Sequence, residues 1–268
     1  MTNHLQIPPN APIGVFDSGM GGLSIWKEIN NLLPRENTIY LADSKNAPYG
    51  EKSRQQIIDF SIKNTELLIS LGCKIIVVAC NTATTNAINI LRQNYHIPFI
   101  GIEPAIKPAA LQSKTHKIGV LATKGTLSSE LFISTSKQYR DAQDIIEVEG
   151  TGLVKLIEEG KLEETYSLLL KYLTPMIEAG VDNIVLGCSH YPFLIPIIQQ
   201  IIPKGVHIID SGEAVAKQTK NMLEQRSLLN ESLIHPEHIF YTNANQVILE
   251  KFLKQIQVKE FKAEAKVF

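Results

Sequence analysis

Residues 13–24 read IGVFDSGMGGLS, a stretch that joins a short apolar run to a glycine-rich turn and the start of a helical pattern. The apolar residues at 13–16 predict a buried strand, and the apolar spacing from Leu23 to Leu33 predicts a helix that ends at Pro34. A strand, a turn and a helix form the first half of a βαβ unit. We therefore expect an α/β fold built on parallel strands.

The same alternation of strands and helices continues along the chain. A second helix is expected from about Ser53 to Leu71, where Gly72 ends it. Further strands are expected at residues 38–42, 74–79, 98–102, 117–121, 144–148, 183–186, 207–209 and 238–241. The helices between them should cover the faces of the sheets.

A weak internal repeat predicts two related halves. Residues 13–24 align with IGVLATKGTLSS at 118–129, and KIIVVACNT at 74–82 aligns with DNIVLGCSH at 182–190. The two alignments are offset by 105 and 108 residues, and the second places a cysteine at the same point of each half. We therefore expect two domains.

The composition excludes several classes of protein. The 268 residues are 44% hydrophobic and 20% charged, which excludes disordered, collagenous and disulfide-dense chains. The net charge of −1 argues against nucleic acid as the main partner. The apolar stretch at 75–80 is too short to cross a membrane, and residues 1–12 indicate an extended arm rather than a secretion signal. Three cysteines do not make a disulfide framework, so we expect free thiols in a cytoplasmic protein.

Cys80 and Cys188 are the strongest candidates for chemistry. Each follows a buried type of strand and precedes polar residues and a helical pattern, and the carboxyl ends of parallel strands form the ligand crevice of α/β folds. Free amides at a helix start should lower the pKa of each thiol and make thiolate available. A single cysteine is usually inert core, but two at equivalent points of a repeat favour a function. Cys73 lies at the other end of its strand and is interpreted as structural.

Polar groups near both cysteines suit a small carboxylate ligand. Asn81, Thr82, Ser189 and His190 stand at helix starts, where they can donate hydrogen bonds to a ligand or cap the helix. A zinc site at Cys80, Cys188 and His190 is only weakly indicated, because no C-x-x-C pair is present.

Two loops contain further candidates. The turn Pro48-Tyr49-Gly50 could offer amides and a phenol to a ligand, or be a plain surface turn. The run at 17–22 matches neither a P-loop nor a dinucleotide fingerprint. Its Asp17 could act as a proton acceptor beside a thiol or only cap the helix.

Two thiols that converge on one crevice predict a reaction in which a proton leaves one face of a carbon and returns to the other. One thiolate would abstract the proton and the opposite thiol would donate one. Racemisation of an amino acid fits this scheme, and no cofactor fingerprint is visible in the sequence. A cysteine hydrolase would leave the second cysteine unexplained.

Five ordered motifs resemble the bacterial glutamate racemases of the aspartate/glutamate racemase family. They read GVFDSGMGGL at 14–23, APYGEKS at 47–53, ACNTAT at 79–84, GIEPA at 101–105 and GCSHYP at 187–192, and the likeness extends through IDSGE at 209–213. The resemblance implies an isomerase that interconverts L- and D-glutamate without a cofactor or a metal. It also implies that the product supplies peptidoglycan synthesis, and so cell-wall biogenesis and cell shape.

The resemblance implies roles for individual residues. Cys80 would take the proton from D-glutamate and Cys188 from L-glutamate, with Asp17 and His190 assisting them. The residues implied to hold the substrate are Asp17, Ser18, Tyr49, Gly50, Asn81, Thr82, Thr123, Ser189 and His190, with Thr126 beside Thr123.

Two departures from the family pattern are visible. Ser189 stands where the family usually has Thr, and it keeps a hydroxyl. The segment at 149–158 lacks the Cys-Pro and aromatic pattern of many members, which leaves open whether Glu158 matches the family's supporting carboxylate.

The resemblance also implies a domain division that is more interleaved than two halves. Residues 1–98 plus 210–268 would form the first α/β domain, which contains Cys80. Residues 99–209 would form the second, which contains Cys188. The two pseudo-symmetric parallel-sheet domains would hold the active-site cleft between them.

Alternatives stay open on substrate and assembly. An aspartate or broad-specificity amino-acid racemase is a close alternative, because one methylene changes pocket fit by only about 1–3 kcal/mol. A non-catalytic amino-acid-binding protein of the same fold is another. A homodimer could form through the N-terminal arm or the tail at 259–268, although charged ends equally fit a solvated surface.

Overall fold

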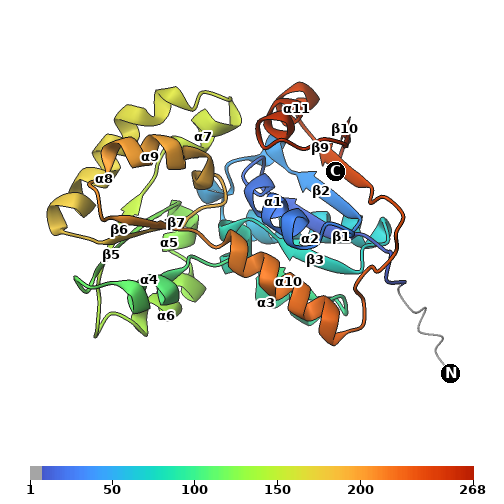
Figure 1. The fold of residues 1–268 in the computed structure, drawn as a ribbon, viewed down its shortest axis with the longest axis horizontal. Helices are drawn as coiled ribbons and strands as arrows, with labels where there is room; N and C mark the ends of the chain where they lie inside the picture. The colour runs from blue at the N-terminus through green and yellow to red at the C-terminus, as the bar shows by residue number, and fades with distance from the viewer. Residues whose placement is uncertain (1–7) are drawn as a thin grey trace.

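The computed structural model describes residues 8–268, so residues 1–7 of the expected N-terminal arm lie outside the described part. The described chain forms two parallel sheets, each with its own helices, which give two lobes side by side (Figure 1). The predicted α/β class with two sets of parallel strands is confirmed.

The larger lobe contains a six-stranded sheet in the order β10-β9-β2-β1-β3-β4. Its strands are β1 (Ile13–Asp17), β2 (Thr38–Ala42), β3 (Ile75–Val78), β4 (Phe99–Gly101), β9 (His238–Thr242) and β10 (Lys262–Ala265). Its helices are α1 (Leu23–Leu32), α2 (Arg54–Ser70), α3 (Asn81–Asn94), α10 (Gly212–Gln225) and α11 (Gln246–Gln255), with the short 3-10 turns η1 (Ser44–Asn46) and η2 (Tyr49–Glu51).

The smaller lobe contains a four-stranded sheet in the order β6-β5-β7-β8. Its strands are β5 (Lys117–Ala122), β6 (Asp144–Glu149), β7 (Asn183–Gly187) and β8 (His207–Ile209). Its helices are α4 (Ile106–Gln112), α5 (Lys124–Leu127), α6 (Glu130–Lys137), α7 (Leu153–Glu158), α8 (Tyr166–Ala179) and α9 (Ile195–Ile201), with the 3-10 turns η3 (Glu163–Thr165) and η4 (Tyr191–Leu194).

The two sheets share one connectivity, in agreement with the internal repeat. The order β2-β1-β3-β4 in the larger lobe matches the order β6-β5-β7-β8 in the smaller lobe. The cysteine of each half follows the third strand of its set, β3 or β7. The larger lobe extends this common unit by β9 and β10, which lie beyond β2.

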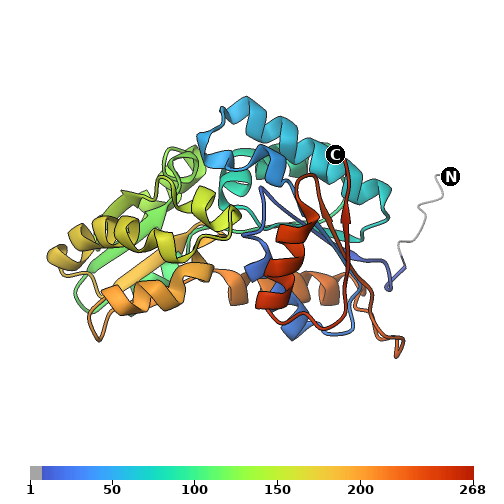
Figure 2. The same ribbon diagram turned by 90° about the horizontal axis from the view of Figure 1, so that it is seen from above.

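Helices cover both faces of each sheet because successive side chains of a strand point to opposite faces. In the larger lobe, Val15 joins the core beneath Trp26 of α1, whereas the next residue, Phe16, joins Ile57 of α2 and Ala83 of α3. Figure 2 shows α2 on one side of this sheet and α11 on the other. One apolar cluster runs through both lobes, so they share part of their core.

The helix that was expected from about Ser53 to Leu71 forms α2, and its start is fixed by a capping box. The Ser53 side chain accepts from the Gln56 amide while the Gln56 side chain accepts from the Ser53 amide. No helix in the described residues is long and apolar enough to cross a membrane.

The tail at 259–268 is exposed or half-exposed throughout, as a solvated end would be, and it also adds an edge strand to the larger sheet. Lys262–Ala265 form β10, which pairs in parallel with β9 at the edge of the larger sheet. The sequence KAEA carries no strand signal, because Lys, Ala and Glu are depleted in strands. Pairing with a neighbouring strand, rather than local propensity, makes this segment a strand.

The domain division stays a prediction. The chain leaves the larger sheet after β4 and returns after β8, at the segments 102–105 and 210–212. A division by sheet membership would therefore place β4 in the first domain, a few residues beyond the predicted boundary at 98.

Candidate active site

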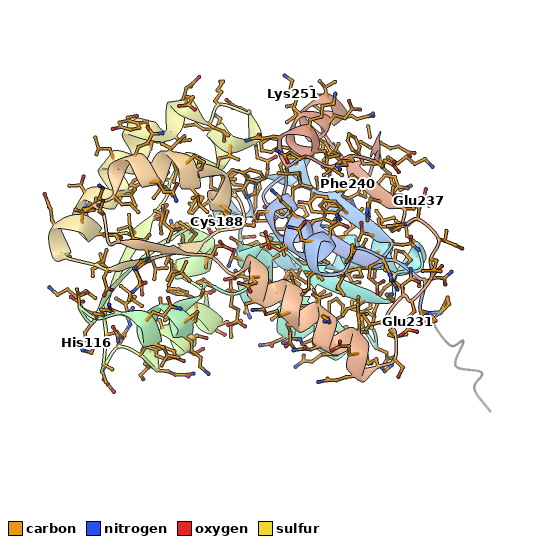
Figure 3. The ribbon with its side chains drawn as sticks, in the orientation of Figure 1. His116, Cys188, Glu231, Glu237, Phe240 and Lys251 are labelled. Atoms are coloured by element: carbon orange, nitrogen blue, oxygen red, sulfur yellow. The ribbon has the colours of Figure 1, made fainter. Side chains whose placement is uncertain are left out.

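Cys80 and Cys188 both line a small cavity between the two lobes. Cys80 follows β3 of the larger lobe by two residues, and Cys188 directly follows β7 of the smaller lobe. Figure 3 labels Cys188 where its lobe faces the other. The full lining consists of Ser18, Pro48, Tyr49, Gly50, Cys80, Asn81, Thr82, Thr123, Val154, Cys188, Ser189 and His190.

This cavity brings together nearly all the residues that the resemblance implied. Asp17 and Thr126 lie directly behind its wall and are fully buried. Pro48 and Val154 line the cavity as well, although no sequence pattern had marked them. The cysteines are only 4% and 6% exposed, so the cavity is closed rather than an open cleft.

Cys80 forms the N-cap of α3. Its sulfur accepts a hydrogen bond from the Ala83 amide at 3.4 Å, and its thiol points at the Ser18 hydroxyl at 3.7 Å. Burial, followed by the nearby charge of Asp17, raises the pKa of the Cys80 thiol well above its usual range. The expectation of a lowered pKa is therefore wrong for Cys80, because burial outweighs the helix-terminal amide. This residue rests as a neutral thiol.

Cys188 has a different neighbourhood, because its sulfur lies 3.8 Å from His190 Nδ1. The other ring nitrogen, Nε2, lies 2.6 Å from Glu158 Oε1. Burial alone would lower the pKa of His190, but hydrogen bonds to Cys188 and Glu158 and the charges of Asp17 and Glu158 raise it well above its usual value. The imidazole is therefore cationic at neutral pH, with an N–H directed at the Cys188 sulfur.

Asp17 connects the two lobes beneath the cavity. Its Oδ1 accepts from the Ser189 hydroxyl at 2.8 Å and its Oδ2 accepts from the Gly19 amide at 2.9 Å. Burial raises the pKa of this carboxyl above its ordinary value. Helix α1 starts after Gly22 and has no side-chain cap, so Asp17 does not cap that helix.

The glycine-rich run after β1 serves close packing against the smaller lobe. A Cβ at Gly19 would overlap the Glu158 carboxylate, and a Cβ at Gly21 would overlap the His190 ring. The Met20 amide between them donates to Glu158 Oε1 at 2.6 Å. The run therefore binds an anion, but that anion is a side chain of the protein itself.

The Tyr49 phenol is engaged away from the cavity. Its hydroxyl donates to Asp43 Oδ2 and accepts from the Asn64 amide at 3.1 Å. The tyrosine therefore offers its ring and the η2 backbone to the cavity, rather than the hydroxyl that the sequence suggested. Asp43 in turn accepts from Asn243, near the end of the chain.

Neutral donors dominate the polar wall of the cavity. The Asn81 side chain is 2% exposed, and both of its polar atoms have no hydrogen-bond partner in the described structure. The hydroxyls of Thr82, Thr123 and Thr126 lie 2.9–3.2 Å from one another and join α3 to α5 across the lobes. Among the described residues, no Lys or Arg side chain lines the cavity.

Glu158 and Ser44 are the site residues that sequence reasoning left open or missed. Glu158 ends α7 and reaches His190, which gives it a supporting place beside Cys188. The Ser44 hydroxyl donates to Glu158 Oε2 at 2.9 Å. These residues are 114 positions apart and share no local pattern, so only the folded chain reveals the contact. Residues 8–268 contain no group of three His, Cys, Asp or Glu side chains arranged to hold a metal ion.

Comparisons with known proteins find relatives over most of the chain. The family model described as Asp/Glu/Hydantoin racemase matches residues 13–219. The chain is 42% identical to the glutamate racemase of Cupriavidus pinatubonensis over 256 residues, which cover 95% of this chain and 94% of that protein.

Two solved structures have the same fold over nearly their whole length. Glutamate racemase of Francisella tularensis in complex with D-glutamate superposes with a TM-score of 0.83 at 30% identity, covering 97% of this chain and 98% of that chain. Escherichia coli glutamate racemase in complex with L-glutamate and the activator UDP-MurNAc-ala superposes with a TM-score of 0.83 at 31% identity, covering 96% and 100%.

Proposed function

Because the chain belongs to the glutamate racemases of the Asp/Glu/hydantoin racemase family and is thus an isomerase, we propose that it interconverts L- and D-glutamate with two cysteine bases. The observation that carries this mechanism is that Cys80 and Cys188, from different lobes, line one cavity. A thiol on each side of one bound amino acid is what inversion at a carbon requires.

The proposed reaction exchanges one proton for another at Cα. With D-glutamate, the Cys80 thiolate takes the α-hydrogen, and the electron pair of the C–H bond moves into the α-carboxylate. The Cys188 thiol then gives its proton to the opposite face of Cα. With L-glutamate the roles reverse, and proton exchange with water returns the thiols to their starting states.

Formation of each thiolate needs a compensating charge. Cys80 rests as a thiol, and the α-ammonium group of bound glutamate would favour its thiolate, since an opposite charge nearby stabilises the ionised form. On the other side, the His190 imidazolium lies against Cys188 and stabilises that thiolate. Asp17 and Glu158 keep His190 charged.

Neutral donors hold the substrate carboxylates in this proposal. Asn81 supports it most directly, because its buried amide has no partner within residues 8–268 and faces the cavity. The amides at the start of α3, the Thr82 and Thr123 hydroxyls and the Gly50 backbone complete the wall. Hydrogen bonds that strengthen as charge moves into the carboxylate stabilise the transition state.

The physiological role follows from the product. We assign the D-glutamate to peptidoglycan synthesis in the cytoplasm, as the family resemblance implies. A strain depleted of this protein is expected to stop growing unless D-glutamate is supplied. Growth without supplement would contradict this assignment if no other source of D-glutamate exists in that strain.

Exchange of the α-hydrogen in deuterated water tests the chemistry. The purified protein, with no cofactor added, is incubated with L-glutamate, D-glutamate and both aspartate enantiomers, and exchange is followed by NMR. We expect deuterium in both glutamate enantiomers. A binding protein would leave the α-hydrogen in place, and a broad-specificity racemase would also exchange aspartate.

Alanine variants assign the two bases. Cys80→Ala should abolish exchange from D-glutamate and Cys188→Ala exchange from L-glutamate, and both should abolish racemisation. Cys73→Ala is the matched control, because burial alone raises the pKa of that thiol to about 12 and it lies away from the cavity. Substantial racemisation by either of the first two variants would refute the two-base mechanism.

A further inference from the structure

The Glu158 carboxylate is held by donors from the opposite lobe. Glu158 belongs to the smaller lobe, but its Oε1 accepts from the Met20 amide at 2.6 Å and its Oε2 accepts from the Ser44 hydroxyl at 2.9 Å. The Glu158 side chain is only 13% exposed. The orientation of this carboxylate therefore depends on two groups across the lobe boundary.

Ser44 is the side chain that distinguishes the two carboxylate oxygens. It begins η1, directly after Asp43, and is half-buried. Within residues 8–268 its hydroxyl makes no other hydrogen bond, so its proton is fully available to Glu158. A charged acceptor makes this bond stronger than one between neutral groups.

The Glu158 carboxylate is connected through His190 to the Cys188 thiol and, within the described residues, makes no such connection to the Cys80 thiol. Glu158 Oε1 lies 2.6 Å from His190 Nε2, and His190 Nδ1 lies 3.8 Å from the Cys188 sulfur. Cys80 has different partners, namely the Ser18 hydroxyl and the Ala83 amide. A disturbance at Glu158 thus reaches Cys188 first.

We propose that Ser44 is a positioning residue that fixes the Glu158 carboxylate on His190 and thereby supports proton transfer at Cys188 rather than at Cys80. With Oε2 held by Ser44, Oε1 stays directed at the imidazole. Without that bond only Oε1 keeps its partners, the Met20 amide and His190, and the carboxylate can pivot about this oxygen, since the last side-chain torsion of glutamate is broad. The catalytic consequence rests on the proposed racemase function, whereas the contact with His190 does not.

Three variants separate positioning from a general structural effect. Ser44→Ala removes the hydroxyl, and Ser44→Thr restores it. Ser61→Ala is the matched control, because Ser61 also has a buried hydroxyl with one acceptor, the Ile57 carbonyl within α2. Thermal unfolding confirms that each variant is folded. If Ser44→Ala unfolds early, Ser44→Cys, which keeps the volume and weakens the donor, replaces it.

The first readout needs no turnover. Protein with isotope-labelled histidine is titrated by NMR without substrate, and the His190 ring signals report its protonation. In Ser44→Ala the titration midpoint of His190 should fall, because the carboxylate is held less firmly against the imidazole. Ser44→Thr and Ser61→Ala should titrate like the wild type.

The second readout compares the two directions of the reaction. Racemisation has an equilibrium constant of one, so kcat/KM falls equally in both directions, by on the order of tenfold for a sub-ångström misplacement. Kinetic isotope effects separate the two proton transfers. With 2-deuterated L-glutamate, whose deuteron Cys188 takes, the effect should rise in Ser44→Ala. With 2-deuterated D-glutamate it should fall.

Each outcome tests either the positioning role of Ser44 or the proposed racemase function. Unchanged His190 titration in Ser44→Ala, or an equal change in Ser61→Ala, overturns the positioning role. Isotope effects that rise equally for both enantiomers also overturn it, because the disturbance would then not be confined to Cys188. A wild-type protein that exchanges no α-hydrogen overturns the proposed racemase function, while the histidine titration still decides the role of Ser44.

Discussion

Replacing Gly125 with alanine should lower activity much more than it lowers stability. Gly125 lies in α5, where the smaller lobe touches the larger lobe beside the cavity. A Cβ at this position would lie 2.8 Å from the Thr82 methyl carbon and 3.1 Å from Gly50 Cα. Both neighbours belong to the opposite lobe, so the added methyl group would act as a wedge between the lobes.

These distances give the displacement that the added methyl group would force on its neighbours. Ordinary contact begins at 3.4 Å, so the Thr82 methyl must retreat by about 0.6 Å, and the Gly50 backbone cannot rotate away. The Thr82 and Thr123 hydroxyls are 2.9 Å apart, and a similar separation would bring them to about 3.5 Å, beyond a good O–H···O bond. Since a 1 Å misplacement costs about 100-fold in rate, we expect kcat/KM to fall by roughly tenfold.

Stability should respond differently from activity. Alanine is favoured over glycine in a helix by about 0.5–1 kcal/mol, which offsets only part of the crowding, since overpacking costs about 1–3 kcal/mol. The midpoint of thermal unfolding should therefore fall by only a few degrees. Racemisation of L-glutamate followed by circular dichroism measures the activity of the same sample.

A second substitution tests whether the methyl group of Thr82 is the cause. Thr82→Ser keeps the hydroxyl and removes the colliding carbon, so the double variant Gly125→Ala/Thr82→Ser should recover part of the lost activity. A double-mutant cycle gives the coupling energy between the two positions. Wild-type kcat/KM in Gly125→Ala, or simple additivity in the cycle, would refute the wedge.

Three further predictions concern substrate binding, the core and acid stability. Asn81→Ala should raise KM for glutamate at least tenfold, because a hydrogen bond to a charged group contributes about 1.5–3 kcal/mol; an unchanged KM would place the carboxylates elsewhere. Lys74→Met should lower the free energy of unfolding in urea by about 3–5 kcal/mol, because Glu36 then stays buried without its partner, and a variant with Met at both positions should regain most of it. Hydrogen bonds from Ser113 and nearby amides outweigh burial and lower the pKa of Asp182 from 3.8 to about 2, so its stabilisation is present above pH 3.8 and lost as pH falls through about 2. Asp182→Asn should therefore be less stable than the wild type at pH 6 and equally stable near pH 1.5, as measured by acid-dependent chemical denaturation; a difference that persists at pH 1.5 would contradict this origin.

The sequence predicted the strands that are apolar and bounded by turns, because a buried strand needs a run of apolar residues that can be recognised in the sequence. Thr38–Ala42 and His207–Ile209 appear with the expected bounds, and the other expected strands differ by one or two residues at their ends. The tail strand Lys262–Ala265 was missed because it lies at a sheet edge, where the neighbouring strand supplies its hydrogen bonds. Its Lys-Ala-Glu-Ala residues do alternate between polar and apolar side chains, but alanine is small and all three residue types are depleted in strands, so the pattern gives little strand signal.

The candidate site was predictable where it depends on strand ends and unpredictable where it depends on lobe contacts. Cys80 and Cys188 follow equivalent strands, so their positions at the carboxyl ends of the two sheets follow from topology, and the packing of the lobes brings both to one cavity. The prediction of a lowered pKa for the Cys80 thiol was wrong, because the sequence shows that a helix begins there but not how deeply the thiol is buried. The contacts of Glu158 with Met20 and Ser44 arise only when two distant segments pack together.

The matching strand orders of the two lobes bear on the origin of the enzyme. A half-length ancestor with one such sheet would have carried a single thiol, and two-sided proton transfer would have required two copies to meet face to face. Gene duplication and fusion turn that encounter into a permanent arrangement within one chain. Each half was then free to diverge, which accounts for a serine and a carboxylate around one sulfur and an imidazole beside the other.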